Sequence, residues 1–258
     1  MRRVAAVILC AGQGTRMGVG ANKVFLPLAG SPVLLWSVGA FERAAVVDDI
    51  LLVAHPDEVE RVRALVADAE PRKVIGVVAG GETRAQSERR ALAALRARIE
   101  AGEIGLVMIH DCARPLIMPE EIARLARDAE TPDAPGGALL AAPVGADEEI
   151  AELGPDGEVA RLFASDELAR AQTPQAFDAR LLLAAYDRAE TDGFDGTDTA
   201  VTVERLGAPV LIVAGSEDNL KLTTPDDVPR AEAIVRGRPH PLAPSPWRRG
   251  GIEEGERE

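Results

Sequence analysis

The chain has 258 residues, of which 47% are hydrophobic and 3% aromatic, and its formal net charge is −13. This length is typical of one α/β domain with at most a small appendage, and no apolar run is long enough to span a bilayer. The negative charge argues against a nucleic-acid-binding surface and against binding to an anionic membrane. The two cysteines indicate buried thiols in a reducing compartment, so we expect a cytoplasmic protein.

A strand and a glycine-rich loop begin the chain. The continuous apolar run at residues 4–10 predicts a buried parallel strand, and glycines at 12, 14 and 18 follow it. Glycine allows a close approach of backbone to ligand, and Arg16 and Lys23 add two positive charges. The loop therefore indicates a polyphosphate site. It is not a P-loop, because no G-x-x-x-x-G-K-[ST] string occurs, and it is not a dinucleotide fingerprint, because its third glycine comes one residue late.

The next segments alternate between helix and strand patterns. Ser31 and Pro32 predict the N-cap and first residue of a helix to about 43. A strand is predicted at 49–55, where His55 is either structural or in contact with ligand, and a helix follows from Pro56 to 69.

A third strand, at 73–79, leads into a second glycine-rich turn. Thr83 and Gln86 fit a capping box for a helix to about residue 99. Open α/β sheets bind ligands where strands end and helices begin. Glu82, Arg84 and Ser87 lie at this helix start, where ordinary capping is the alternative to a functional role.

The fourth predicted strand, at 106–111, ends in a carboxylate. Asp111 at the tip of a buried strand, opposite the phosphate loop, is well placed to hold Mg²⁺. His110 and Arg114 flank it and could orient the carboxylate or contact phosphate. A strand-capping role for the acid is the alternative.

The second half of the chain predicts a helix at 119–129, a strand at 137–144 and then a hairpin. Residues 146–153 and 158–163 flank a strong turn at 154–157, which indicates a protruding β-hairpin. Because such a hairpin is unstable alone, we expect it to pack against a second subunit in a homodimer.

The remaining predictions complete the domain. They are a helix at 178–190, a helix start at 196–199 with Thr197 as cap, a strand at 209–214 and a last helix capped by residues 224–225. We expect a single domain over 1–236, with a dimerisation arm at about 145–170. Residues 237–258 lack apolar periodicity, which predicts a disordered tail.

Seven strings resemble, in order, the 2-C-methyl-D-erythritol 4-phosphate cytidylyltransferase family, over roughly residues 4–235. They are A-G-Q-G-T-R-M-G with Lys23, G-G-E-T-R-A-Q-S (80–87), I-H-D-C-A-R-P (109–115), A-P-V (142–144), A-Q-T-P-Q-A-F (171–177), G-T-D-T-A (196–200) and D-N-L-K-L-T-T-P (218–225). The resemblance implies an α/β fold with a Rossmann-like, mostly parallel sheet, helices on both faces and a protruding hairpin arm. It also implies Mg²⁺-dependent transfer of CMP from CTP to methylerythritol 4-phosphate in the non-mevalonate isoprenoid pathway.

The same resemblance implies a role for each matching residue. The implied catalytic residues are Arg16, Lys23 and Lys221. The implied nucleotide-binding residues are Ala11, Gly12, Gly14, Thr15, Gly81, Glu82 and Ser87, with Glu82 standing where the family usually has Asp. The implied acceptor-binding residues are Thr173, Thr197, Lys221 and Arg114, and Asp111 is the implied metal ligand.

Two departures concern the acceptor half. Asp147 stands where the family has a Thr that reaches the acceptor phosphate, and Ala164 and Ser165 replace an Asp–Arg pair whose Arg clamps it. A lost charge-assisted contact typically costs about 1.5–3 kcal/mol, and Arg161 and Arg170 are the candidates to substitute. The alternatives are therefore another acceptor, such as ribitol 5-phosphate or another polyol or sugar phosphate, and a catalytically inactive nucleotide-binding homologue.

Overall fold

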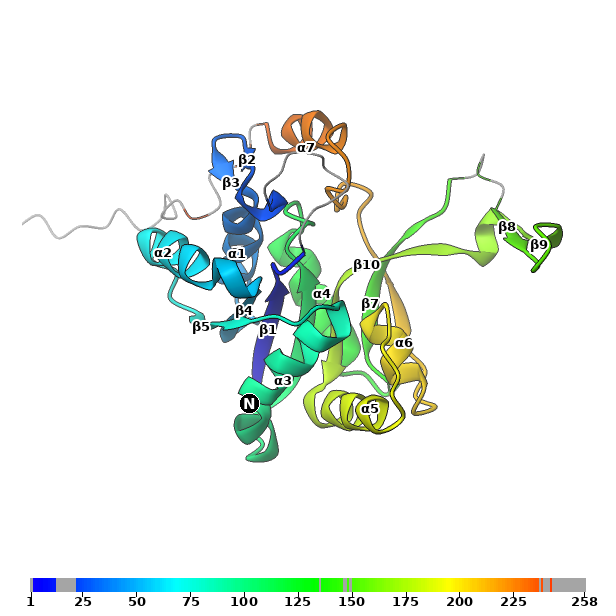
Figure 1. Ribbon diagram of the computed structural model, residues 1–258, viewed down its shortest axis with the longest axis horizontal. Helices are drawn as coiled ribbons and strands as arrows, with labels where there is room; N and C mark the ends of the chain where they lie inside the picture. Colours follow the sequence, from blue (N-terminus) through cyan, green and yellow to red (C-terminus); the bar gives the residue numbers. More distant parts are fainter. Residues whose placement is uncertain are drawn as a thin grey trace, which may run out of the picture.

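A seven-stranded sheet organises the molecule (Figure 1). The structure is a computed structural model that describes residues 2–12, 22–134, 136–145, 148, 150–236, 238 and 242. The strand order is β11-β7-β10-β6-β1-β4-β5. The strands are β1 (Arg3–Leu9), β4 (Asp49–Ala54), β5 (Val74–Ala79), β6 (Ile104–Asp111), β7 (Ala138–Pro143), β10 (Ala169–Asp178) and β11 (Leu211–Ala214). Strand β10 runs antiparallel to both of its neighbours and the other pairings in this sheet are parallel, so the predicted mostly parallel sheet is confirmed.

Helices cover both faces of this sheet, as predicted (Figure 1). One face packs α1 (Val33–Arg43), α2 (Val59–Ala69), α4 (Pro119–Ala129) and α7 (Asp227–Val235). The other packs α3 (Arg84–Glu100), α5 (Ala179–Thr191) and α6 (Thr199–Glu204).

The first strand shows why the chain forms two cores. Val4, Ala6 and Ile8 point into one core and Ala5 and Val7 into the other, because successive side chains of a strand alternate between faces. A strand covered on both sides must be apolar at every position. This places the end of β1 at the edge of a rigid layer.

The arm is a two-stranded antiparallel hairpin of β8 (Ile150–Leu153) and β9 (Val159–Phe163), which projects from the sheet (Figure 1). Leu153, Val159 and Leu162 are exposed on it. The predicted hairpin is therefore confirmed. Its connections return to the sheet through β7 and β10, which pair up to Ala169 and Pro143.

Three predicted helix starts are wrong. Ser31 and Pro32 form the short strand β3 (Ser31–Pro32), paired with β2 (Pro27–Leu28), and α1 begins at Val33 without a side-chain cap. The carboxylate of Asp198, rather than Thr197, caps α6, because it accepts the N–H of Ala200. The last helix begins at Asp227, two residues later than expected.

Strand β10 was not predicted. Its residues 171–177 were recognised only as a string, because polar side chains and Pro174 interrupt any apolar alternation. A register shift between Ala171 and Gln175 in the β7 pairing accommodates this stretch. The strand inserts between β6 and β7. Because it runs antiparallel to β6, the carboxyl end of β6 lies beside the middle of β10, where the Asp111 N–H donates to Thr173.

Candidate active site

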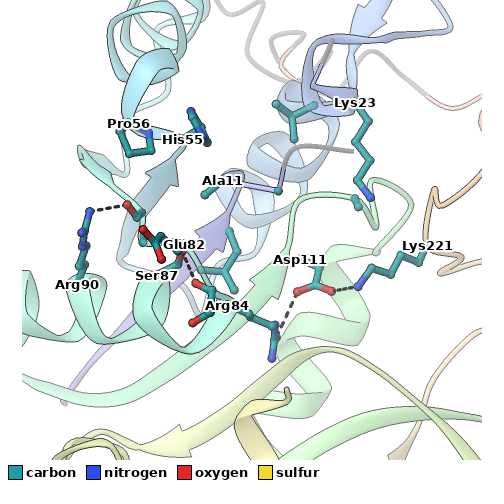
Figure 2. Close-up of a pocket in the computed structure, with 17 residues that line it drawn as sticks. Ala11, Lys23, His55, Pro56, Glu82, Arg84, Ser87, Arg90, Asp111 and Lys221 are labelled. Atoms are coloured by element: carbon teal, nitrogen blue, oxygen red, sulfur yellow. Dashed lines mark hydrogen bonds and ion pairs between the residues drawn. The ribbon is translucent and has the colours of Figure 1, made fainter. Parts of the chain in front are cut away.

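A cavity of about 670 Å³ opens at the carboxyl ends of β6, the central strand of the sheet, and its neighbour β1 (Figure 2). Ligands of open α/β sheets bind at this edge. Most of the sequence-predicted site residues in the described ranges come together there: Ala11, Gly12, Lys23, Gly81, Glu82, Ser87, Asp111 and Lys221 line the cavity. His55 lines it too.

The other predicted site residues either fall outside the described ranges or do not line the cavity. Gly14, Thr15 and Arg16 are outside the described residues, as is Asp147. Thr197 is exposed and does not line the cavity. The guanidinium of Arg114 donates to the backbone carbonyls of Asn219 and Ala171, so in this structure it braces the segment that carries Lys221.

The Asp111 carboxylate is held between two cations (Figure 2). Lys221 Nζ lies 2.6 Å from Oδ2, and Arg84 Nη2 lies 3.2 Å from Oδ1. Burial alone would raise the pKa of Asp111, but the charges of Arg84 and Lys221 outweigh burial and hold that pKa well below its usual range. The carboxylate is therefore ionised at neutral pH.

Thr173 and His110 fix the backbone of Asp111. The Asp111 N–H donates to Thr173 Oγ1 at 2.9 Å, and Thr173 Oγ1 lies 3.2 Å from His110 Nδ1. Burial lowers the pKa of His110 to about 3, so its ring is neutral. Nε2 then donates to the Arg114 carbonyl at 3.2 Å, and Nδ1 accepts from Thr173. The Thr173 hydroxyl thus positions Asp111.

Lys23 enters the cavity from the segment after the glycine loop. Its Nζ donates to the Leu222 carbonyl at 3.0 Å, which brings Lys23 and Lys221 to the same part of the cavity (Figure 2). The preceding Asn22 amide donates to the Cys10 carbonyl and to Glu58. The returning end of the loop is therefore tied to the end of β1, and two ammonium groups face a site where a polyanion would fit.

The start of α3 forms the opposite wall. Thr83 Oγ1 accepts the N–H of Gln86, as predicted for the N-cap, while the Gln86 side chain accepts from Glu82 N–H, one residue earlier than a capping box requires. Ser87 Oγ accepts the N–H of Gly81 and donates to the Thr83 carbonyl. This turn presents glycine backbone and short polar side chains.

Gly80 lies so close to its neighbours that an added side chain would clash with them, which allows a test of this wall. A Cβ at this position would lie 2.7 Å from Ala11 Cβ and 2.8 Å from Ser87 Oγ. Gly80→Ala must therefore move both walls of the cavity. We expect the KM for CTP, the nucleotide that the sequence resemblance implies, to rise about tenfold, from a clash of about 1–3 kcal/mol. Gly76→Ala, at a position on β5 where a Cβ would make only an ordinary contact with Leu51 Cδ1 at 3.8 Å, is the control in a steady-state assay. An unchanged KM in Gly80→Ala would show that this wall does not contact the nucleotide.

Two residues of this region were missed in the sequence. Glu88 is fully buried on α3 and contacts Arg84, and Arg90 lines the cavity and donates to the Gly80 carbonyl. The available signal was spacing: Glu88 lies four residues after Arg84, and the two side chains therefore share a helix face. The charged sequence of this helix gives no sign that one of its acids is buried.

The whole chain was compared with known proteins. The model of the 2-C-methyl-D-erythritol 4-phosphate cytidylyltransferase family matches residues 4–237. The chain belongs to this family. Relatives named as this enzyme include one from Acidobacterium capsulatum, 38% identical over 92% of this chain and 98% of the relative, and one from Bacillus velezensis, 41% identical over 89% and 94%. A crystal structure of the Thermus thermophilus enzyme superposes with a TM-score of 0.65 at 30% identity, covering 91% of this chain and 99% of that one.

Family membership confirms the resemblance drawn from the seven strings. The protein is a nucleotidyltransferase of the cytidylyltransferase type. Its cavity joins the segment after the signature loop, the α3 turn and the Asp111–Lys221 pair. Along the described ranges, no helix has both the length and the hydropathy that crossing a membrane requires.

Proposed function

We propose that the protein transfers CMP from CTP to 2-C-methyl-D-erythritol 4-phosphate and releases pyrophosphate, a step in isoprenoid precursor synthesis. The observation that carries the proposal is the cavity in which Lys23, Lys221 and the ionised Asp111 meet the glycine-rich walls. Two ammonium groups suit a triphosphate beside a phosphorylated acceptor.

The reaction needs positioning more than covalent chemistry. An oxygen of the acceptor phosphate attacks the α-phosphorus of CTP in line, the new O–P bond forms, and the bond to the β-phosphate oxygen breaks as pyrophosphate leaves. Lys23 and Lys221, with Arg16 of the loop, stabilise the charge that develops on the α-phosphate. Gly81, Glu82 and Ser87 hold the cytosine. Thr173, Thr197 and Arg114 are the proposed acceptor-side residues, and none of the three lines this cavity.

We propose Asp111 as the residue that holds Mg²⁺. Among the described residues, no group of three or more His, Cys, Asp or Glu is arranged to bind a metal, but Mg²⁺ is often bound by one carboxylate together with substrate phosphates. The donor fits: the carboxylate lines the cavity and its pKa, held low, keeps it ionised. When bound, Mg²⁺ would neutralise charge on the triphosphate.

We also propose that the arm pairs two copies of the chain. Leu153, Val159 and Leu162 are exposed on a two-stranded hairpin, a surface that a partner would cover. Arg170 forms an ion pair with Glu148 at the arm's base, and Arg161 stacks on Phe163. These arginines are the candidates for the acceptor clamp that Ser165 lacks. The buried free thiols of Cys10 and Cys112 suit the cytoplasm.

The test is Mg²⁺-dependent pyrophosphate release from CTP, measured with methylerythritol 4-phosphate, with ribitol 5-phosphate and without acceptor. Of these three conditions, we expect pyrophosphate release only when methylerythritol 4-phosphate is the acceptor. Release only with ribitol 5-phosphate would assign Asp147 and Ser165 to a changed acceptor specificity. CTP binding with no release from any acceptor would instead support the inactive nucleotide-binding homologue.

A further inference from the structure

We propose that Glu88, which lies behind the cavity wall, is a positioning residue that divides the Arg84 guanidinium between two carboxylates and so limits its hold on Asp111. Arg84 Nη1 lies 3.0 Å from Glu88 Oε1, while Nη2 lies 3.2 Å from Asp111 Oδ1. The two ends of one guanidinium thus serve two close acids, with Asp198 Oδ2 farther away, at 3.7 Å from Nη1. The inference rests on the proposed function for its activity readout.

The placement of Arg84 is not explained by helix stability. Arg84 is the first residue of α3, where the helix dipole disfavours a cation. An Arg that precedes a Glu by four residues is also the weaker orientation of a helical ion pair. The carboxylates of Glu88, Asp111 and Asp198 hold the guanidinium there instead.

The Glu88 contact changes how Arg84 meets Asp111. An arginine beside a lone carboxylate commonly forms two parallel hydrogen bonds with it. Here Nη1 is taken by Glu88 and Thr199, so Asp111 receives a single bond from Arg84. The rest of the Asp111 carboxylate stays available to the cavity and to Lys221.

The ionised form of Glu88 is costly because its side chain is buried. Its side chain is 1% exposed, and burial raises its pKa to about 7, although Arg84 and the Thr199 hydroxyl lower it. The charged groups that act on it are Arg84 on its own helix, Asp111 at the end of β6 and Asp198 at the start of α6. The pKa of Glu88 is higher in the folded protein than its ordinary value, so the folded state is most stable when Glu88 is protonated. This contribution to the free energy of unfolding is lost as pH rises through about 7.

This combination predicts opposite effects on activity and stability. At about pH 8, we expect Glu88→Gln to lower kcat/KM about tenfold, as for a lost charge-assisted contact. The same variant should melt about 2–4 °C higher than the wild type, because it no longer buries a charge. Both differences should shrink at about pH 6, where Glu88 of the wild type is itself protonated.

Thr199 offers a rescue. Its Oγ1 lies 3.0 Å from Glu88 Oε1 and 3.3 Å from Arg84 Nη1, so an aspartate at 199 places a carboxylate oxygen within reach of the same guanidinium. We expect Glu88→Gln/Thr199→Asp to recover most of the lost activity at about pH 8, and a merely structural role would give no such recovery.

The control is Glu121→Gln, a buried carboxylate on α4 that accepts from Met118 and Ser216 backbone N–H groups. It should lower the melting temperature and leave the shape of the pH profile unchanged. The proposal is overturned if Glu88→Gln has the same kcat/KM as the wild type. It is also overturned if Glu88→Gln loses activity, melts at a lower temperature and is not rescued by Thr199→Asp. The comparison of melting temperatures does not depend on turnover. A failure of this inference can therefore be distinguished from a failure of the proposed function.

Discussion

Asp111→Asn is expected to lower kcat/KM for pyrophosphate release by about 10²–10³-fold, the size of effect seen when one preorganised electrostatic group is removed. The amide has nearly the shape of the carboxylate but carries no charge. It therefore leaves Lys221 and Arg84 without the anion that they share at 2.6 and 3.2 Å. It also removes the proposed Mg²⁺ ligand, so added Mg²⁺ should restore little activity.

Asp187→Asn is the matched control for this loss. Asp187 lies on α5 and pairs with Arg96 at the surface, where an ion pair contributes little. Its kcat/KM should equal that of the wild type. If Asp111→Asn stays folded by circular dichroism and retains more than about a tenth of the activity, the central role of Asp111 is wrong.

Phe177→Ala is expected to destabilise the fold by about 3–5 kcal/mol, because it leaves a large cavity in a close-packed core. The ring is 0% exposed in the core between the sheet, α3 and α5. It fills the space beside Gly137, where a Cβ added to the glycine would come within 2.6 Å of the ring. The free energy of unfolding from urea titration measures the loss.

Phe194→Ala serves as the comparison, since its ring is only partly buried on a surface loop beneath the Arg205 guanidinium. A smaller loss is expected there. Equal losses for the two variants would mean that the core around β10 relaxes into the space, or that Phe177 packs more loosely than its burial indicates.

The sequence was sufficient to predict those parts of the site in which the functional residues directly follow a strand. The loop after β1, the α3 turn and Asp111 were each recognisable because strand ends carry characteristic residues. The parallel sheet order then brings the ends of β1 and β6 together. Lys221 could be assigned only through family resemblance, because the segment that carries it has no regular structure between β11 and α7.

The remaining features depend on contacts between distant segments. The Arg84–Asp111 contact requires α3 and β6 to be packed in register, and the burial of Glu88 requires α6 to cover it. Strand β10 is specified by its neighbours rather than by its own pattern. Asp198 rather than Thr197 caps α6, because its carboxylate is also held by the side-chain amide of Gln175 on β10. Local spacing in the sequence does not reveal this partner.

Strand β10 makes the arm and the active site parts of one mechanical element. Its first residues pair with β7 where the arm departs (Figure 1), and a few residues later Thr173 Oγ1 accepts the backbone N–H of Asp111. We therefore expect a displacement of the hairpin to reach Asp111 along β10, which is continuous from Ala169 to Asp178. Lengthening or shortening the arm at its base would shift catalytic geometry even if every side chain in the cavity were unchanged.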